Sequence, residues 1–195
     1  MLKIQLIRHT MTKGNLLGRY IGKTDEPLCK EGMQLLYGKS YQAAEQVYVS
    51  PLMRCVQTAD LIFENVPQKV VESLRECDFG DFENKNYKEL EKNASYQSWI
   101  DSQGKMLFPG GESPEYFKRR CCLAFCKIIK DALRKEYRNI AIVAHGGTIM
   151  SIMERYGKPE ASFYDWQVKN AGGYLLELDE EKWIAKKKVC VKSSL

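Results

Sequence analysis

Histidine is scarce in this chain, because only His9 and His145 occur among its 195 residues. The seven cysteines include no Cys-x-x-Cys pair, so the thiolates of a zinc ribbon and the motif of a thioredoxin-like enzyme are both missing. The cysteines are odd in number and lack disulfide-framework spacing, and we expect most of them to be small core residues. We therefore expect no dedicated metal site and no cofactor.

Two well-known phosphate loops are absent as well. No cysteine is followed six positions later by an arginine, which excludes the Cys-x5-Arg loop of cysteine phosphatases. The segment from Gly18 to Thr24 has three residues between its glycines, where a nucleotide-binding P-loop has four, and no strand directly precedes it. The sequence therefore argues against a nucleoside triphosphatase.

Long hydrophobic runs and strong charge are also lacking. No apolar stretch is long enough to span a bilayer, and Arg8 interrupts the N-terminal one before it could form a secretory signal. The formal charge is only +5, without the clustered arginines and aromatics of a nucleic-acid-binding surface. We expect a single cytoplasmic domain, residues 1–195, that binds neither nucleic acid nor membrane and acts on a small anion.

Apolar periodicity predicts alternating strands and helices. Residues 139–144 form the clearest strand, since an uninterrupted apolar run is typical of a central parallel strand buried on both faces. Residues 117–133 carry apolar side chains at helical spacing, after a Ser113-Pro114 helix start. Further strands are expected at 2–7, 47–50 and 69–71, and further helices at 30–44, 52–63 and 149–156. This pattern predicts an α/β fold, a three-layer α/β/α sandwich with a mostly parallel central sheet.

Two segments fall outside this alternation. Residues 77–110 are rich in turns, with short helices expected near 87–92 and 96–102, and we expect them to form a small cap or lid. The C-terminal residues 173–191 are expected to form a hairpin that turns at 179–181.

Basic and imidazole side chains follow three of the predicted strands. Arg8 and His9 come directly after the first strand. Arg54 lies in the first turn of the helix after the second, and His145 ends the strand at 139–144. Because the carboxyl ends of parallel strands meet at one edge of a sheet, we expect these groups to share a pocket. Arginines and helix N-termini both favour anions, so an anionic ligand is indicated.

Six short motifs, spread in order over residues 4–150, resemble those of one enzyme family. They are Arg8-His9-Thr10 with Asn15, Gly22-x-x-Asp25-x-x-Leu28, Ser50-Pro51-Leu-x-Arg54-x-x-Gln57-Thr58-Ala59, Leu74-Arg75-Glu76, Gly110-Gly111-Glu112-Ser113 and Ala144-His145-Gly146-Gly147. The family is the histidine phosphatase superfamily, which has the phosphoglycerate mutase-like fold. Within it, Arg19-Tyr20-x-Gly22-x-Thr24-Asp25 and the segment 74–80 most resemble the α-ribazole phosphatase branch of cobalamin synthesis.

The resemblance implies a role for each of these polar groups. His9 is the implied nucleophile, which takes the phosphoryl group as a phosphohistidine, and nearby arginines disfavour protonation of its ring. Glu76 is implied to protonate the leaving alkoxide and then to take a proton from water. Cations lower the pKa of an acid, so this role requires partial burial of Glu76. The implied phosphate ligands are Arg8, Asn15, Gly22, Arg54, His145 (protonated or donating) and the Gly146 N–H.

Three positions depart from the family's pattern. Thr10 stands where glycine is usual, so a side chain is expected to crowd the turn beside His9. Phe82 and Asn84 stand where the α-ribazole branch commonly has tryptophan and glycine. Both are expected to flank the pocket, which affects the choice of substrate and leaves the catalytic groups in place.

Three functions are compatible with these residues. The expected one is a metal-independent phosphatase for a small phosphorylated metabolite, with α-ribazole 5′-phosphate as the branch's substrate. A phosphoglycerate mutase would return the phosphoryl group to substrate, but mutases of this family carry a longer insertion than residues 77–109. A non-catalytic phosphate-binding relative would usually lack the nucleophile or an arginine. A homodimer remains open.

Overall fold

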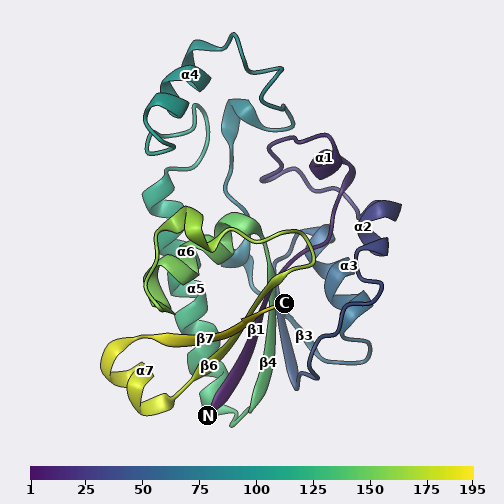
Figure 1. Cartoon of the computed structure of the whole chain (residues 1–195), viewed down its shortest axis with the longest axis vertical. Coiled ribbons are helices and arrows are strands. Elements are labelled where there is room, and N and C mark those ends of the chain that lie inside the picture. The colour runs from purple at the N-terminus through teal and green to yellow at the C-terminus, as the bar shows by residue number, and fades with distance from the viewer.

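The computed structural model describes residues 1 to 195, and its centre is a seven-stranded sheet (Figure 1). The strands are β1 Leu2–Arg8, β2 Gln46–Val49, β3 Gln68–Val70, β4 Asn139–Ala144, β5 Gly157–Lys158, β6 Gly173–Leu178 and β7 Val189–Ser194. They lie in the order β3-β2-β4-β1-β6-β7-β5. Pairing is parallel from β3 to β1, whereas β6 runs antiparallel to β1 and β7. The prediction of a mostly parallel sheet is confirmed.

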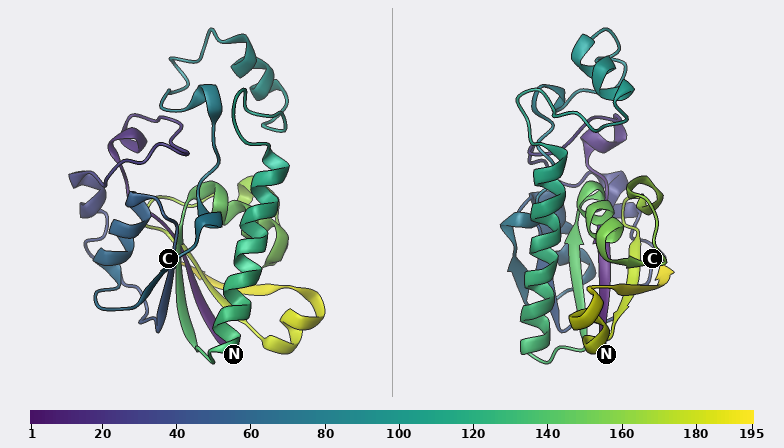
Figure 2. Two further views of the ribbon diagram at one scale, coloured as in Figure 1. Left: turned by 180° about the vertical axis from the view of Figure 1, so that it is seen from behind. Right: turned by 90° about the vertical axis from the view of Figure 1, so that its left-hand side faces the viewer.

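Helices cover both faces of this sheet (Figure 2). They are α1 Lys13–Leu16, α2 Lys30–Gln34, α3 Met53–Ile62, α4 Ala94–Asp101, α5 Pro114–Arg134, α6 Gly146–Tyr156 and α7 Glu180–Lys186, with 3-10 turns η1 Glu72–Leu74, η2 Gly80–Phe82 and η3 Phe163–Trp166. Successive side chains of β4 point to opposite faces. Ile140 and Ile142 join the core beneath α5 and α6, whereas Ala141 and Val143 join the core beneath α3. The predicted three-layer sandwich is therefore confirmed.

Helix α5 begins where the sequence predicts. Ser113 caps it by accepting from the N–H of Tyr116, and Pro114 occupies its first turn. The predicted apolar stripe is buried from Phe117 to Ala132, and only its last member, Leu133, is half-buried. Neither α5 nor any other helix combines the length and apolar character that a bilayer span requires.

Residues 77–110 project beyond the carboxyl edge of the sheet, at the top of Figure 1. We call this segment the cap. It has an aromatic core of its own, in which Phe82 contacts Tyr96, Trp99 and Phe108 with ring centroids 5.4, 6.3 and 6.0 Å away. Phe82 is fully buried in this cluster, so it stabilises the cap and does not flank the pocket as expected.

Two predicted helices are wrong in extent or in kind. The helix predicted at 30–44 stops after α2, and Gly38 further on has a φ of +76°, a left-handed conformation in which a helix cannot continue. Residues 87–92 form turns. The side chain of Asn86 accepts from the N–H groups of Lys88 and Glu89 as a helix cap would, but only Leu90 then makes an i→i−4 bond, and the next backbone bonds span three residues.

The predicted C-terminal hairpin is wrong in its connection. Strands β6 and β7 do pair antiparallel, but the chain between them forms helix α7. Asp179 caps this helix by accepting from the N–H of Lys182. Trp183 packs against Phe125 and Tyr156, with ring centroids 5.8 and 5.3 Å away. Burial of this large ring on α5 and α6 outweighs the local alternation that predicted a strand.

Candidate active site

The two histidines and Arg54 meet at the carboxyl edge of the sheet. His9 follows β1 and His145 follows β4, and their ring centroids lie 5.1 Å apart. Arg54, from the first turn of α3, donates through Nε to Nδ1 of His145 at 3.3 Å. All three side chains are buried. The structure thus brings together three of the four groups predicted at the strand ends, and the cavity described below is lined by the fourth, Arg8, and by none of these three.

The hydrogen bonds of His9 determine which ring nitrogen is bare. Its Nδ1 lies 2.6 Å from the carbonyl oxygen of Thr10. A carbonyl oxygen only accepts, so Nδ1 carries a proton, and in a neutral ring Nε2 then keeps its lone pair. His9 is only 3% exposed, so this lone pair is shielded from bulk water.

His145 has the opposite tautomer. The Nε–H of Arg54 can only donate, so Nδ1 of His145 accepts, and Nε2 of a neutral ring donates to Ser50 Oγ at 2.7 Å. Burial, followed by the charge of Arg54, lowers the pKa of both His9 and His145 well below the ordinary value. Both rings are therefore neutral near pH 7. Of the two states expected for His145, the structure favours the neutral donor.

The guanidinium of Arg54 is occupied by the loop that leads from α1 to α2. It donates to the carbonyl oxygens of Thr24 at 2.7 Å, Gly22 at 2.8 Å and Ile21 at 3.3 Å. Glu83 binds the same loop from the cap, accepting from the Gly22 N–H at 3.2 Å and the Thr24 hydroxyl at 2.7 Å. Gly22, expected to bind phosphate, thus offers its carbonyl to Arg54 and its N–H to Glu83.

Arg8 and the first turn of α6 lie side by side. Arg8 donates through Nη1 to the Val168 carbonyl at 2.8 Å, while its buried Nε–H has no partner in the protein. A Cβ on Gly146 would lie 3.5 Å from the guanidinium carbon of Arg8. N–H groups in the first turn of a helix have no intrahelical acceptor. Arg8 and Gly146 can therefore donate to the same anion.

Glu76 stands where the chain enters the cap. Its carboxylate accepts from the N–H groups of Cys77 at 3.0 Å and Gly147 at 3.1 Å. Burial raises the pKa of this carboxyl above its ordinary value, and it outweighs the two N–H groups and the charges of Arg54 and Arg8, which act in the other direction. Glu76 is half-buried, so the partial burial that a proton donor among cations requires is present.

The remaining expected residues lie around these groups. Asn170 donates to the His9 carbonyl at 3.0 Å and to Asn15 Oδ1 at 3.5 Å, which connects Asn15 to the backbone of His9. Thr10 is fully buried, and its hydroxyl donates to the carbonyl of Gly32. The side chain that was expected to crowd the turn is therefore accommodated by a hydrogen bond to the segment around Gly32.

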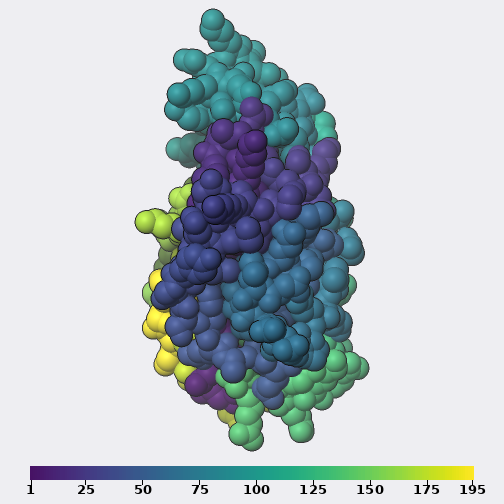
Figure 3. Space-filling view, turned by 90° about the vertical axis from the view of Figure 1, so that its right-hand side faces the viewer, coloured from purple at the N-terminus to yellow at the C-terminus, as the bar shows by residue number.

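The loop from α1 to α2 lies directly beneath the cap (Figure 3). Asn84 has a φ of +56°, a left-handed conformation that asparagine tolerates better than most residues. Its carbonyl accepts from the guanidinium of Arg19, and its N–H donates to the Tyr20 carbonyl at 2.8 Å. Asn84 therefore joins the loop to the cap and does not line the pocket.

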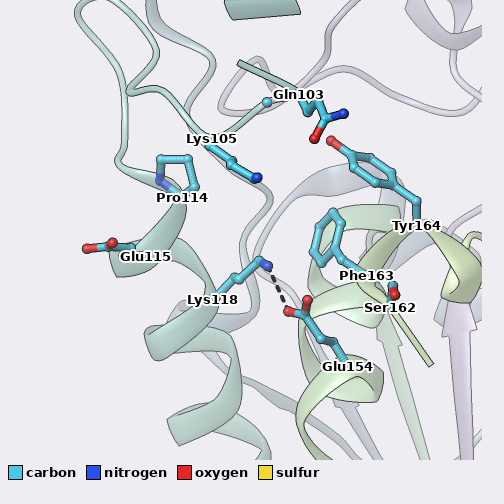
Figure 4. A pocket seen from close by; sticks show the side chains of 10 residues that line it. Gln103, Lys105, Pro114, Glu115, Lys118, Glu154, Ser162, Phe163 and Tyr164 are labelled. Atoms are coloured by element: carbon cyan, nitrogen blue, oxygen red, sulfur yellow. Dashed lines mark hydrogen bonds and ion pairs between the residues drawn. The ribbon is translucent and has the colours of Figure 1, made fainter. Parts of the chain in front are cut away.

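A cavity of about 320 Å³ opens beside Arg8 and Glu76, its only charged lining residues. Half of the other lining residues are aromatic, namely Tyr20, Phe79, Trp99, Phe108, Phe117, Phe163 and Tyr164. An adjoining hollow shares Phe163 and Tyr164 with it, and Figure 4 shows these two rings facing Gln103 and Lys105 across the opening. We call the first space the aromatic cavity.

Several residues around the site escaped prediction. Ser50 and Glu112 belong to motifs that the sequence shows, but nothing local assigns them a partner. Glu83 bonds to a residue 61 positions away, and Arg120 bonds to the Glu76 carbonyl 44 positions away. Contacts over such distances leave no periodic signal in the chain, so only the fold reveals them.

The fold and the cluster together define a class of protein. A sheet covered on both faces holds a buried neutral imidazole near two arginines, with a protonatable carboxyl close by, which suits phosphoryl transfer to and from nitrogen. The sequence matches the histidine phosphatase superfamily (branch 1) over residues 4–190. The chain belongs to that superfamily, and it is a phosphomonoesterase of the histidine phosphatase type.

Named relatives act on more than one phosphoester. The adenosylcobalamin/alpha-ribazole phosphatase of Salmonella typhimurium is 29% identical over 177 residues, which cover 86% of each chain. The metal-independent phosphoserine phosphatase of Arabidopsis thaliana is 27% identical over 193 residues, which cover 93% of this chain and 79% of the relative. The crystal structure of the alpha-ribazole phosphatase from Shigella flexneri shares the fold, with a TM-score of 0.80 at 24% identity over 98% of this chain and 95% of that one.

Gly147 is predicted to be required for the position of Glu76. A Cβ at Gly147 would lie 2.5 Å from Glu76 Oε1, whereas one at Gly146 meets nothing closer than 3.5 Å. Gly147→Ala should therefore displace the carboxyl and lower kcat by about 10- to 100-fold, part of what a general acid contributes. Gly146→Ala is the matched control and should lose less. Steady-state kinetics with melting curves will separate this effect from unfolding, and equal losses in both variants would contradict it.

The lowered pKa of His9 predicts a loss of stability in mild acid. The folded pKa lies below the unfolded value of 6.5, so below pH 6.5 the unfolded chain binds more protons and the free energy of unfolding falls as the pH falls. His9→Gln removes this contribution, and its stability should fall less steeply, by up to about 1.4 kcal/mol per pH unit. Urea unfolding between pH 7.5 and 5.5 will measure the difference. Parallel curves for the two proteins would refute the assignment.

Proposed function

We propose that the protein hydrolyses phosphomonoesters through a phosphohistidine at His9. The observation that carries this proposal is the hydrogen bond from Nδ1 of His9 to the Thr10 carbonyl. It leaves Nε2 of a neutral ring as the nucleophile, ready to attack phosphorus in line with the leaving oxygen. The lowered pKa of the ring keeps this nitrogen unprotonated at neutral pH.

Arg8 and Arg54 stabilise the charge on the transferring phosphoryl group in this proposal. Arg8 has an unpaired buried Nε–H beside the start of α6. Arg54 is held by three backbone carbonyls, and a charged phosphoryl oxygen is a stronger acceptor than a carbonyl. Substrate therefore replaces part of the loop as the partner of Arg54. Loss of one such donor typically costs about 2.7–4 kcal/mol of transition-state stabilisation.

Glu76 serves as the proton donor and then as the base. In this proposal Glu76 is protonated when substrate arrives and gives its proton to the leaving alkoxide, and the raised pKa of its carboxyl favours that state. The resulting carboxylate takes a proton from the water that attacks the phosphohistidine, and phosphate leaves. This second step returns both Glu76 and His9 to their starting protonation states.

We propose α-ribazole 5′-phosphate as the substrate. The named Salmonella relative supports this, and so does the aromatic cavity, whose walls suit the flat benzimidazole of that molecule. Its charged residues, Arg8 and Glu76, are both committed to the phosphoryl end. The ammonium and carboxylate groups of phosphoserine would find no charged partner among the aromatic rings, and their desolvation would be costly.

A substrate panel tests this proposal. We expect kcat/KM for α-ribazole 5′-phosphate to exceed that for phosphoserine and 3-phosphoglycerate by at least about 100-fold, the selectivity of roughly 2.7 kcal/mol that an unpaired buried charge produces. Phosphate release at low substrate concentration gives the ratios, with His9→Ala as the inactive control. A preference for phosphoserine would contradict the assignment. Transfer of the phosphoryl group from 3-phosphoglycerate to a second sugar acid, in place of phosphate release, would contradict it too.

The role of Glu76 predicts a dependence on the leaving group. Nitrophenolate leaves without protonation, whereas an alkoxide does not. Glu76→Gln should therefore slow phosphorylation of His9 by an alkyl phosphate about 10²- to 10⁴-fold, and should slow it much less with p-nitrophenyl phosphate. Rapid acid quench with labelled substrates measures this step directly. Similar losses with both leaving groups would exclude Glu76 as the acid.

A further inference from the structure

The base of the cap is formed by two segments that lie side by side. Glu76 stands where the chain enters the cap, and Glu112 stands where it returns. The Glu112 N–H donates to the Asp78 carbonyl at 2.9 Å. Gly111 permits this close approach, because a Cβ there would lie 2.4 Å from the same carbonyl oxygen. The position of Glu76 therefore depends on the contacts that hold these two segments against each other.

Arg120, on α5, holds both segments at once. Its Nη1 donates to the carbonyl oxygens of Arg75 at 2.8 Å and Ser73 at 3.1 Å, and its Nη2 donates to the Glu76 carbonyl at 2.9 Å. Its Nε and Nη2 also donate to the two carboxylate oxygens of Glu112 at 2.7 and 2.8 Å. One guanidinium thus joins the turn before Glu76 to the returning segment.

This contact is largely shielded from water and uses the full shape of the guanidinium. The side chains of Arg120 and Glu112 are 12% and 11% exposed, so water screens their attraction little. A bidentate pair of this kind also fixes direction, which a lysine ammonium cannot reproduce. Arg120 does not line the aromatic cavity; with Glu76 and Glu112 it lines a separate hollow of about 330 Å³ at the base of the cap, and its contact with Glu76 is made through the backbone carbonyl.

We propose that Arg120 is a positioning residue for the proton donor. It holds Glu76 through the backbone of residues 73–76, so that the carboxyl meets the Gly147 N–H at the wall of the aromatic cavity. Through Glu112 it holds the cap above that cavity. This inference rests on the proposed function, because it assigns Arg120 to the acid of that reaction.

Loss of Arg120 has a predictable effect on Glu76. The charged groups that face this carboxyl are Arg8 at the end of β1, Arg54 on α3 and Arg120 on α5, and the titratable thiols near it are those of Cys55, Cys77 and Cys121. Arg54 and Arg8, which are the main cations that lower its pKa, remain after the change. Loss of the Arg120 charge by itself would raise this pKa, but burial is the largest cause of the shift, so a carboxyl that gains solvent should have a pKa closer to the ordinary value. The alkaline limb of the pH–rate profile should then move to lower pH.

The test compares Arg120→Met with Arg119→Met. Arg119 directly precedes Arg120 on α5 and is exposed, so Arg119→Met removes the same charge without disturbing the cap. With α-ribazole 5′-phosphate, we expect Arg120→Met to lower kcat about 10- to 100-fold and to change KM less than about threefold. Its alkaline limb should move to lower pH, and Arg119→Met should match the wild type. The amplitude of the nitrophenol burst from p-nitrophenyl phosphate gives the concentration of active sites. Dividing the rate by this concentration corrects kcat for any unfolded protein.

A second variant guards against a purely structural effect. Millimolar guanidinium should restore part of kcat in Arg120→Ala and none in Arg119→Ala. The inference is overturned if kcat falls only in proportion to the working sites with the alkaline limb unmoved, or if guanidinium restores nothing. A wild type without His9-dependent hydrolysis would overturn the proposed function and this inference together. That result is read from wild type and His9→Ala alone, so the two failures are distinguishable.

Discussion

Exclusion of water at the carboxyl edge of the sheet is the constraint on which the site depends. The same burial acts in opposite directions on the two reacting groups, because it lowers the pKa of His9 and raises that of Glu76. The two shifts have the directions that the proposed reaction requires, because His9 loses its proton more readily and Glu76 holds its proton more tightly. Arg8 and Arg54 could not produce this pairing by charge alone, since cations lower both pKa values.

Buried cations in this protein are stabilised mainly by backbone carbonyl oxygens. Arg54 is fully buried and bonds to three carbonyls of the loop from α1 to α2. Arg120 bonds to three carbonyls before the cap and to Glu112. A carbonyl is a weaker acceptor than a phosphoryl oxygen, so in the proposed reaction the charge of Arg54 is available to substrate. Glu112 is a full counter-charge, which suits Arg120 to a lasting structural contact.

Parts of the chain with local signals were predictable. The apolar run of β4, the stripe of α5 and the Ser113 cap each lie within one element, so spacing alone identifies them. Prediction was wrong where a distant contact outweighs local preference. Trp183 makes a helix of the expected strand because it packs on α5 and α6. Phe82 was expected at the pocket, but its partners Tyr96 and Phe108 draw it into the core of the cap.

The sequence by itself determined which chemical groups stand at the strand ends, because a residue's place after a strand depends on a few neighbours. It therefore sufficed for the superfamily, the α/β sandwich and the meeting of His9, Arg54 and His145. Only the tertiary structure decided which atoms of these groups carry or hold a proton. The tautomers of both histidines and the raised pKa of Glu76 depend on burial and on partners such as Thr10, Ser50 and Gly147. Most of these partners come from other elements, and water is excluded only when all of them have packed.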